Sequence, residues 1–178
     1  LSFVHALSPL HAGTGQGAGI IDLPIAREKA TGLPYLPGSS VKGTLRARCT
    51  NPDDRYKVFG PEMDGRPTDD NYASSAQFSD QRLLLLPIRS LAGTFAWVTS
   101  PYILRRFARD IKDAQLPLPQ EAIPLINDEN ACAVANETSK IKIEGSVYLE
   151  DLALEKVETS MAAQSWAEWI AARVFPND

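Results

Sequence analysis

Apolar and polar residues alternate with a period of two in several parts of the chain, a pattern typical of β-strands. This alternation predicts a first strand over residues 1–11 and two further strands over about 80–88 and 93–99. A longer alternating stretch at 141–155 predicts another strand, with a bulge at Gly145 because an isolated glycine in a strand often marks one.

Three other stretches repeat their apolar residues every three or four positions, which predicts helices over 38–49, 100–114 and 160–175. Ser39 and Ser100 stand where N-cap residues of the first two helices are expected. The apolar residues expected along these helices are Val41, Leu45, Ile103, Phe107, Ile111, Met161, Trp166, Trp169 and Ile170.

The segments between these elements are rich in turn-forming residues, at about 12–38, 60–76 and 115–139. The predicted order is strand, helix, two strands, helix, strand and helix. This order is typical of the α+β class, of which the ferredoxin-like split βαβ arrangement is the commonest version. We therefore expect a single domain over 1–178, with long loop insertions at these three segments.

Composition places the chain among ordinary globular proteins, since 44% of its 178 residues are hydrophobic. No apolar run approaches the ~20 residues that a membrane-spanning helix needs, so we expect no membrane partner. Two cysteines, Cys49 and Cys132, cannot build a disulfide framework or a zinc site. They favour reduced thiols and hence a cytoplasmic protein.

Charge is distributed unevenly along the chain. The net charge of −4 argues weakly against a free nucleic-acid-binding protein. However, residues 1–119 contain 14 Lys and Arg against 11 Asp and Glu, whereas residues 120–178 contain 4 against 11. A basic front part joined to an acidic rear part is consistent with a polyanion groove on one face, or with subunits that stack head to tail.

The glycine-rich segment "HAGTGQGAG" at 11–19 invites comparison with phosphate-binding loops. It lacks the Gly-Lys-Ser/Thr of a Walker loop, and no helix follows it as a Rossmann fingerprint requires. Its glycines favour either a flexible loop or close approach of the backbone to a large partner.

The helix start that follows is chemically suited to phosphate. Free N–H groups at a helix N-terminus attract anions, and Lys42 and Arg46 stand one turn apart behind Ser39 and Ser40. Gly43 between them leaves room for another backbone. The alternative interpretation is an ordinary capped helix with a solvated basic edge.

Asp22 is an isolated carboxylate between Ile21 and Leu23. It either forms a turn or acts chemically, by holding Mg²⁺ through water or by orienting a ribose hydroxyl. One aspartate cannot build a two-metal nuclease site alone. His11 is the nearby base, although a buried or capping histidine is the simpler interpretation.

Three long segments resemble the RAMP superfamily of CRISPR-associated proteins, and within it the backbone subunits of type III-B (Cmr) effector complexes. The segments are "GIIDLPIAREKATGLPYLPGSSVKGTLR", "FSDQRLLLLPIRSLAGTFAWVTSPYILRRFARD" and "SWAEWIAARVFP". The resemblance implies an RRM-like (ferredoxin-like) palm with long loop insertions. Because family members continue with further strands and a glycine-rich loop beyond a "VFPND"-like segment, it also implies a chain that is incomplete at its C-terminus.

The resemblance also implies roles for individual residues. Asp22 would cleave target RNA, and His11 matches the histidine that follows the first strand in the family. Contacts to the guide RNA backbone are implied for Gly38, Ser39, Ser40, Lys42, Gly43 and Arg46. The implied cofactor is a divalent metal, Mg²⁺ or Mn²⁺, bound by Asp22 through water.

The implied function is that of a guide-RNA-binding backbone subunit that cleaves complementary single-stranded target RNA. It would act as a metal-dependent endoribonuclease inside an assembled complex, by 2′-OH attack or by hydrolysis, and the isolated chain would be inactive. Its partners would be the guide RNA (crRNA), the target RNA, other RAMP subunits and further copies of itself stacked into a helical filament. Two alternatives stay open, namely a non-catalytic RNA-binding RAMP subunit and a guide-processing endoribonuclease that uses His11.

Overall fold

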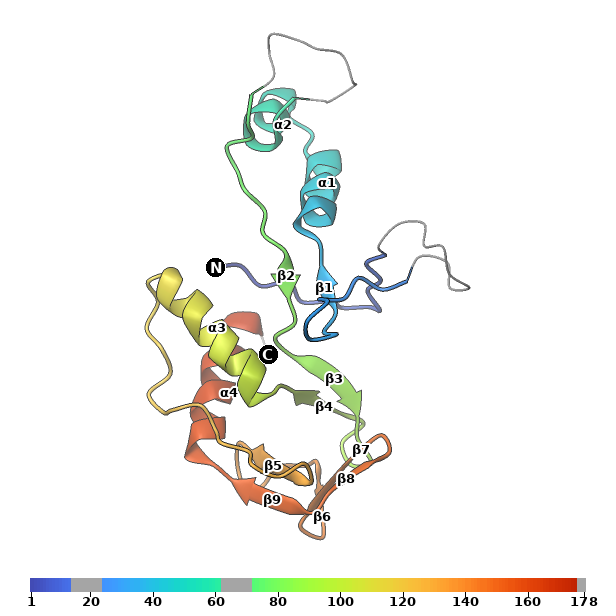
Figure 1. Cartoon of the computed structure of the whole chain (residues 1–178), viewed down its shortest axis with the longest axis vertical. Coiled ribbons are helices and arrows are strands. Elements are labelled where there is room, and N and C mark those ends of the chain that lie inside the picture. The colour runs from blue at the N-terminus through green and yellow to red at the C-terminus, as the bar shows by residue number, and fades with distance from the viewer. Residues whose placement is uncertain (14–23, 62–71, 176–178) are drawn as a thin grey trace. The chain divides into compact units, whose positions relative to one another are not determined.

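The structure is a computed structural model that describes residues 1–13, 24–61 and 72–175. Much of two predicted insertions, at 14–23 and 62–71, therefore lies outside the described residues. The chain divides into two compact units (Figure 1). Unit 1 contains Leu1–His5 and Leu84–Asp178, and unit 2 contains Ala6–Leu83.

Unit 2 is built on short extended segments that pair in succession. Gly13 pairs with Ile25, Arg27 with Pro34, and strand β1 (Tyr35–Leu36) with strand β2 (Gln81–Arg82). Ala26 lies at the centre of this arrangement and is completely buried. These pairings give hydrogen-bond partners to backbone N–H and C=O groups that regular secondary structure does not satisfy in such short segments.

Helix α1 (Gly38–Arg48) is confirmed, but the prediction of Ser39 as its N-cap is wrong. The N-cap position is Pro37, and the Gly38 N–H donates instead to Asp80 Oδ1 at 2.9 Å. The predicted core face is wrong at Leu45, which is 44% exposed. Gly38 is the only residue of α1 that is buried, so this helix contributes little to a core.

The sequence predicts no helix directly after α1, because Asn-Pro-Asp-Asp at 51–54 is typical of a helix end. The structure nevertheless has helix α2 there (Pro52–Phe59). The same residues start a helix here. The Asn51 side chain accepts from Asp53 N at 3.0 Å and Asp54 N at 3.4 Å, and Pro52 occupies the first helical position, which suits proline.

The two strands predicted near residues 80–99 are confirmed in unit 1 as β3 (Leu86–Arg89) and β4 (Phe95–Val98), which pair antiparallel. Helix α3 (Pro101–Asp113) follows directly and is confirmed with its cap, because Ser100 Oγ accepts from Ile103 N at 3.3 Å.

The prediction of one bulged strand over 141–155 is wrong, because the chain reverses direction there. Strands β6 (Lys142–Ile143), β7 (Ser146–Leu149) and β8 (Leu152–Leu154) form an antiparallel sheet. Gly145 has φ +87° and Glu144 φ +50°, which are the left-handed conformations of a tight hairpin turn rather than of a bulge.

The prediction of an irregular segment over 115–139 is also partly wrong. Strand β5 (Ala131–Val134) pairs in parallel with β9 (Lys156–Thr159), which precedes helix α4 (Met161–Val174).

Residues 1–11 do not form the predicted strand. A strand needs a neighbour to accept and donate its backbone hydrogen bonds, and no strand of the described ranges forms a ladder with this segment. Phe3 nevertheless packs against the core, since its ring contacts that of Phe107 edge-on, with 6.0 Å between the ring centroids.

Unit 1 contains two apolar clusters. Core cluster 1 joins α3 to α4, which lie side by side in Figure 1, and core cluster 2 lies between β4, β5 and β7. The members of core cluster 1 are Leu104, Phe107, Ile111, Trp166, Trp169 and Ile170, and those of core cluster 2 are Ala96, Val134, Val147 and Leu149. Met161 is 75% exposed and does not join them. The mixture of helices with mainly antiparallel strands confirms the α+β class.

No helix within the ranges 1–13, 24–61 and 72–175 is both long and apolar enough to cross a membrane.

Candidate nucleic-acid interface

Asp22, the predicted cleaving residue, lies outside the described residues, but the backbone on both sides of its segment is described. Ala26 N donates to Ala12 O at 2.8 Å, next to the Gly13–Ile25 bridge. The two ends of the segment that contains Asp22 are therefore held together. His11 is exposed and comes two residues before this pair.

The same pairings connect this segment to helix α1. Tyr35 N donates to Ala26 O at 3.1 Å, and Tyr35 belongs to β1, which ends two residues before Gly38. Backbone hydrogen bonds in unit 2 thus connect Ala26, which follows the segment that contains Asp22, to the strand that precedes α1.

The N-terminus of α1 already has acceptors for several of its N–H groups. Gly38 N is bonded to the Asp80 carboxylate, while Ser40 N and Val41 N donate to Pro37 O at 3.0 and 3.2 Å. The carboxylate also opposes an anion at this end of the helix. The exposed hydroxyl groups of Ser39 and Ser40 are therefore better placed for a phosphate than the free N–H groups that the sequence suggested.

Lys42 and Arg46 both have partners inside unit 2. Lys42 Nζ donates to Ser74 Oγ at 2.9 Å. Arg46 donates to the carbonyl of Gly60, the residue that ends α2, and its guanidinium lies 6.0 Å from the centroid of the Tyr56 ring. Arg46 therefore stabilises the end of α2, whatever else it contacts.

Sequence reasoning did not single out Arg48 and Lys57, which are exposed basic residues of the same pair of helices. The signal that points to them is the excess of Lys and Arg over 27–57, with 7 basic residues against 3 acidic ones. Arg55 belongs to this group, but its guanidinium donates to Cys49 O at 3.1 and 2.7 Å and so holds the two helices together.

Gly43 has no packing reason among the residues that the structure describes. A Cβ atom built there would have no heavy atom within 4 Å, whereas glycine inside a helix costs about 1 kcal/mol relative to alanine. An exposed glycine in mid-helix is consistent with a partner whose backbone comes close to α1.

A metal site is not assembled by the residues that the structure describes, because no three His, Cys, Asp or Glu side chains come together among them. These residues alone do not fit Mg²⁺ or Mn²⁺. The predicted metal therefore depends on Asp22, together with oxygen ligands from outside the described ranges.

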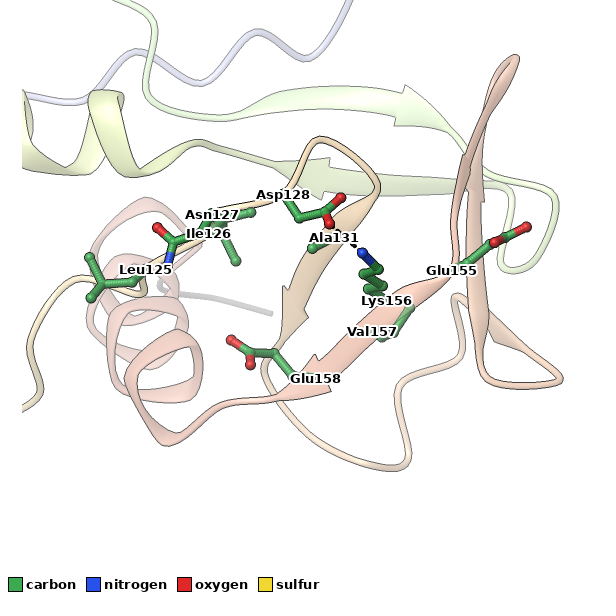
Figure 2. A pocket seen from close by; sticks show the side chains of 9 residues that line it. All are labelled: Leu125, Ile126, Asn127, Asp128, Ala131, Glu155, Lys156, Val157 and Glu158. Atoms are coloured by element: carbon green, nitrogen blue, oxygen red, sulfur yellow. Dashed lines mark hydrogen bonds and ion pairs between the residues drawn. The ribbon is translucent and has the colours of Figure 1, made fainter.

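Unit 1 contains a pocket of about 610 Å³ between residues 125–131 and β9 (Figure 2). Figure 2 shows Lys156 reaching from β9 to Asp128, with which it forms an ion pair. This hydrogen bond lowers the pKa of Asp128 below its ordinary value and raises the pKa of Lys156. Because Glu155 and Glu158 add two further negative charges, the pocket does not suit a polyanion.

Cys132 lies next to this pocket on β5. Burial, together with the charge of Glu158, raises the pKa of the Cys132 thiol. The thiol therefore stays protonated at neutral pH, in keeping with a structural role.

Comparisons with known proteins place this arrangement in a family. The model of the RAMP superfamily matches residues 3–169. The chain belongs to the RAMP superfamily. This match confirms the predicted resemblance to the RAMP superfamily, and the fold seen in related structures confirms the predicted α+β class.

The chain is 36% identical over 158 residues to the CRISPR system Cmr endoribonuclease Cmr4 of Pyrococcus furiosus. This alignment covers 85% of this chain and 50% of that protein. It superposes on a crystal structure of oligomeric Cmr4 from the same organism with a TM-score of 0.73 at 29% identity, over 94% of this chain and 59% of the other. A Csm3 endoribonuclease of Streptococcus thermophilus is 31% identical over 64 residues, 36% of this chain and 26% of that protein. The chain thus spans about half the length of the curated Cmr4 protein.

Proposed function

We propose that this chain is the guide-RNA-binding part of a backbone subunit in a type III-B CRISPR effector complex. The observation that supports this most directly is the 36% identity to a Cmr endoribonuclease over 85% of the chain. The exposed start of α1 adds physical support, since it combines two free hydroxyl groups, a basic helix pair and a glycine with open space around it.

Guide binding in this proposal uses the backbone of the RNA rather than its bases. Ser39 and Ser40 would donate to phosphate oxygens, and Gly43 would let the sugar-phosphate chain approach the helix. Lys42 and Arg46 would add positive charge while keeping the contacts that they make inside unit 2. Contacts of this kind position the RNA and carry no sequence information, as a subunit that accepts any guide requires.

Target cleavage in this proposal depends on Asp22, with His11 as the base on the other side of the same paired segment. A carboxylate beside the scissile phosphate can orient or deprotonate the attacking 2′-OH, or it can hold a metal-bound water for hydrolysis. The endoribonuclease would act only in the assembled cytoplasmic complex, because the isolated chain lacks the guide that presents the target.

The proposed partners are guide RNA, single-stranded target RNA, other RAMP subunits and further copies of this chain. The excess of basic residues in 1–119 and of acidic residues in 120–178 favours head-to-tail contacts between copies. Such contacts are heterologous, so copies can stack along the guide into an open filament.

The experiment that tests cleavage is Asp22→Asn in the full-length protein, assembled with its guide RNA and the other subunits. We expect target cleavage to be lost and guide binding to be retained, because a residue that acts on the reaction need not contribute to binding. Asp54→Asn, which changes an exposed aspartate in the first turn of α2, is the matched control and should cleave normally.

Normal cleavage by the Asp22→Asn complex would contradict the catalytic role and leave a structural RNA-binding subunit. If instead His11→Ala abolished processing of the guide precursor, the guide-processing alternative would be favoured.

A further inference from the structure

One face of the β3–β4 ribbon in unit 1 is aromatic. Arg89 pairs with Phe95 and Pro87 with Trp97 in the antiparallel register, and directly opposite residues share a face of the sheet. The other face carries Ala96, which is buried in core cluster 2. The ribbon therefore has one side committed to the core and one side that core cluster 2 does not cover.

The two large rings on the free side remain in contact with solvent. Phe95 is 47% exposed and Trp97 41% exposed, although their centroids are 5.6 Å apart in an edge-to-face contact. Isolated exposed apolar residues are common, but an exposed aromatic cluster usually marks a binding surface.

Two further rings from distant parts of unit 1 extend this surface. The His5 ring lies 5.9 Å from that of Trp97, and the Phe175 ring lies 5.4 Å from it. We call Pro87, Arg89, Phe95, Trp97, His5 and Phe175 the aromatic face. None of the six is acidic, and Arg89 is exposed beside Phe95.

The order of residues along β4 also points to a ligand. Phe95-Ala96-Trp97-Val98 has the aromatic, small, aromatic, valine order of a signature strand in RNA recognition motifs. In those domains the two aromatic residues of this strand project from the open face of the sheet and stack on unpaired bases.

We propose that Phe95 and Trp97 form a stacking platform for one or two unpaired bases of single-stranded RNA, with Arg89 beside them for a phosphate. This inference rests on the proposed function as an RNA-binding subunit, and it assigns RNA contacts to unit 1 that differ in kind from those of α1. Stacking is independent of sequence, because every base has a π-face. Arg89 adds a positive charge beside the two rings, which suits the charge of the RNA backbone, and the nearby exposed acid is Glu150, whose N–H donates to Arg89 O at 2.9 Å.

The test uses the full-length protein and a fluorescein-labelled 12-nucleotide oligouridine, with fluorescence anisotropy measured at several salt concentrations. We expect Trp97→Leu to weaken binding roughly five- to hundredfold, which is the range for loss of one stacked base. The dependence on salt should not change, because the variant removes no phosphate contact. Trp97→Phe keeps a ring and should bind within about twofold of the unchanged protein.

Two further variants serve as controls. Tyr102→Leu removes another ring of unit 1, which is also 47% exposed but lies on α3, and it should bind RNA normally. Lys42→Ala should weaken binding and reduce the salt slope by about one ion if its contact is made. If Lys42→Ala weakens binding and Trp97→Leu does not, the stacking platform is wrong and the proposed function stands. If the unchanged protein binds no RNA at all, both are wrong.

A second measurement needs no variant and therefore does not depend on how Trp97→Leu folds. Ultraviolet cross-linking to RNA that contains 5-iodouridine should yield adducts on Phe95 or Trp97 when the digested protein is analysed by mass spectrometry. Adducts confined to unit 2 would overturn the proposal. The proposal would also be overturned if Trp97→Leu dissociated an oligomer of the protein in solution while its RNA affinity stayed unchanged. The aromatic face would then bind protein.

Discussion

Helices α1 and α3 have similar lengths, 11 and 13 residues, but they use their side chains differently. Helix α3 buries five residues, and three of them, Leu104, Phe107 and Ile111, belong to core cluster 1 together with residues of α4. Helix α1 buries only Gly38 and exposes Leu45. Packing therefore explains most of the sequence of α3. In α1, Lys42 and Arg46 have partners inside unit 2, but the described residues give no packing role to Ser39, Ser40 and Gly43, which suit a partner outside the chain.

The largest difference between the two helices should appear when an apolar residue is removed from each. Phe107→Ala should reduce the free energy of unfolding by about 3–5 kcal/mol, because the ring is almost fully buried and contacts Phe3 and Trp169. Leu45→Ala, at an exposed position, should change it by less than about 1 kcal/mol. Urea denaturation followed by circular dichroism measures both values. Equal losses would show that α1 also belongs to a core.

The sequence predicted α3 well because its signals are local. Ser100, Pro101 and the apolar stripe all lie within the helix or beside it. The start of α1 could not be predicted in the same way, because its first N–H group is bonded to Asp80, which is 42 positions away. A serine at the expected place is not a cap when a distant carboxylate already occupies that role.

The errors in unit 1 have a similar cause. Strand β5 pairs with β9, which is distant in the sequence, so nothing local distinguishes it from a loop. The reversal at Glu144 and Gly145 depends on positive φ angles that the alternating pattern does not reveal. In the candidate site, the residue types and their spacing predicted the position of helix α1 in the sequence. They did not predict that Lys42 and Arg46 form hydrogen bonds inside unit 2.

The two glycines of α1 provide a comparison within one helix. In Gly38→Ala the new Cβ would lie 2.2 Å from the backbone oxygen of Phe78, so part of the chain must shift, and we expect a loss of about 1–3 kcal/mol. In Gly43→Ala the Cβ would have no described heavy atom within 4 Å, so the helix should gain about 0.5–1 kcal/mol.

RNA affinity should respond to the Gly43 change in the opposite sense to stability. If a sugar-phosphate backbone approaches α1 at Gly43, the added methyl group should weaken guide binding although the fold is more stable. Thermal unfolding and RNA titration of the same two samples separate the effects. Unchanged guide binding by Gly43→Ala would mean that the glycine has no role in close approach.

The smallest expected effect comes from the serines at the two helix starts. Ser100 Oγ accepts from the Ile103 N–H, so Ser100→Ala should cost about 1 kcal/mol of stability. Ser39 makes no capping hydrogen bond in α1, so Ser39→Ala should leave stability nearly unchanged. The same change should reduce affinity for guide RNA, since it removes an exposed hydroxyl group from the proposed phosphate contact. Ser40→Ala would resemble Ser39→Ala in both measurements if the two hydroxyl groups share that role. A loss of stability at Ser39 equal to that at Ser100, with no loss of affinity, would instead make α1 an ordinary capped helix.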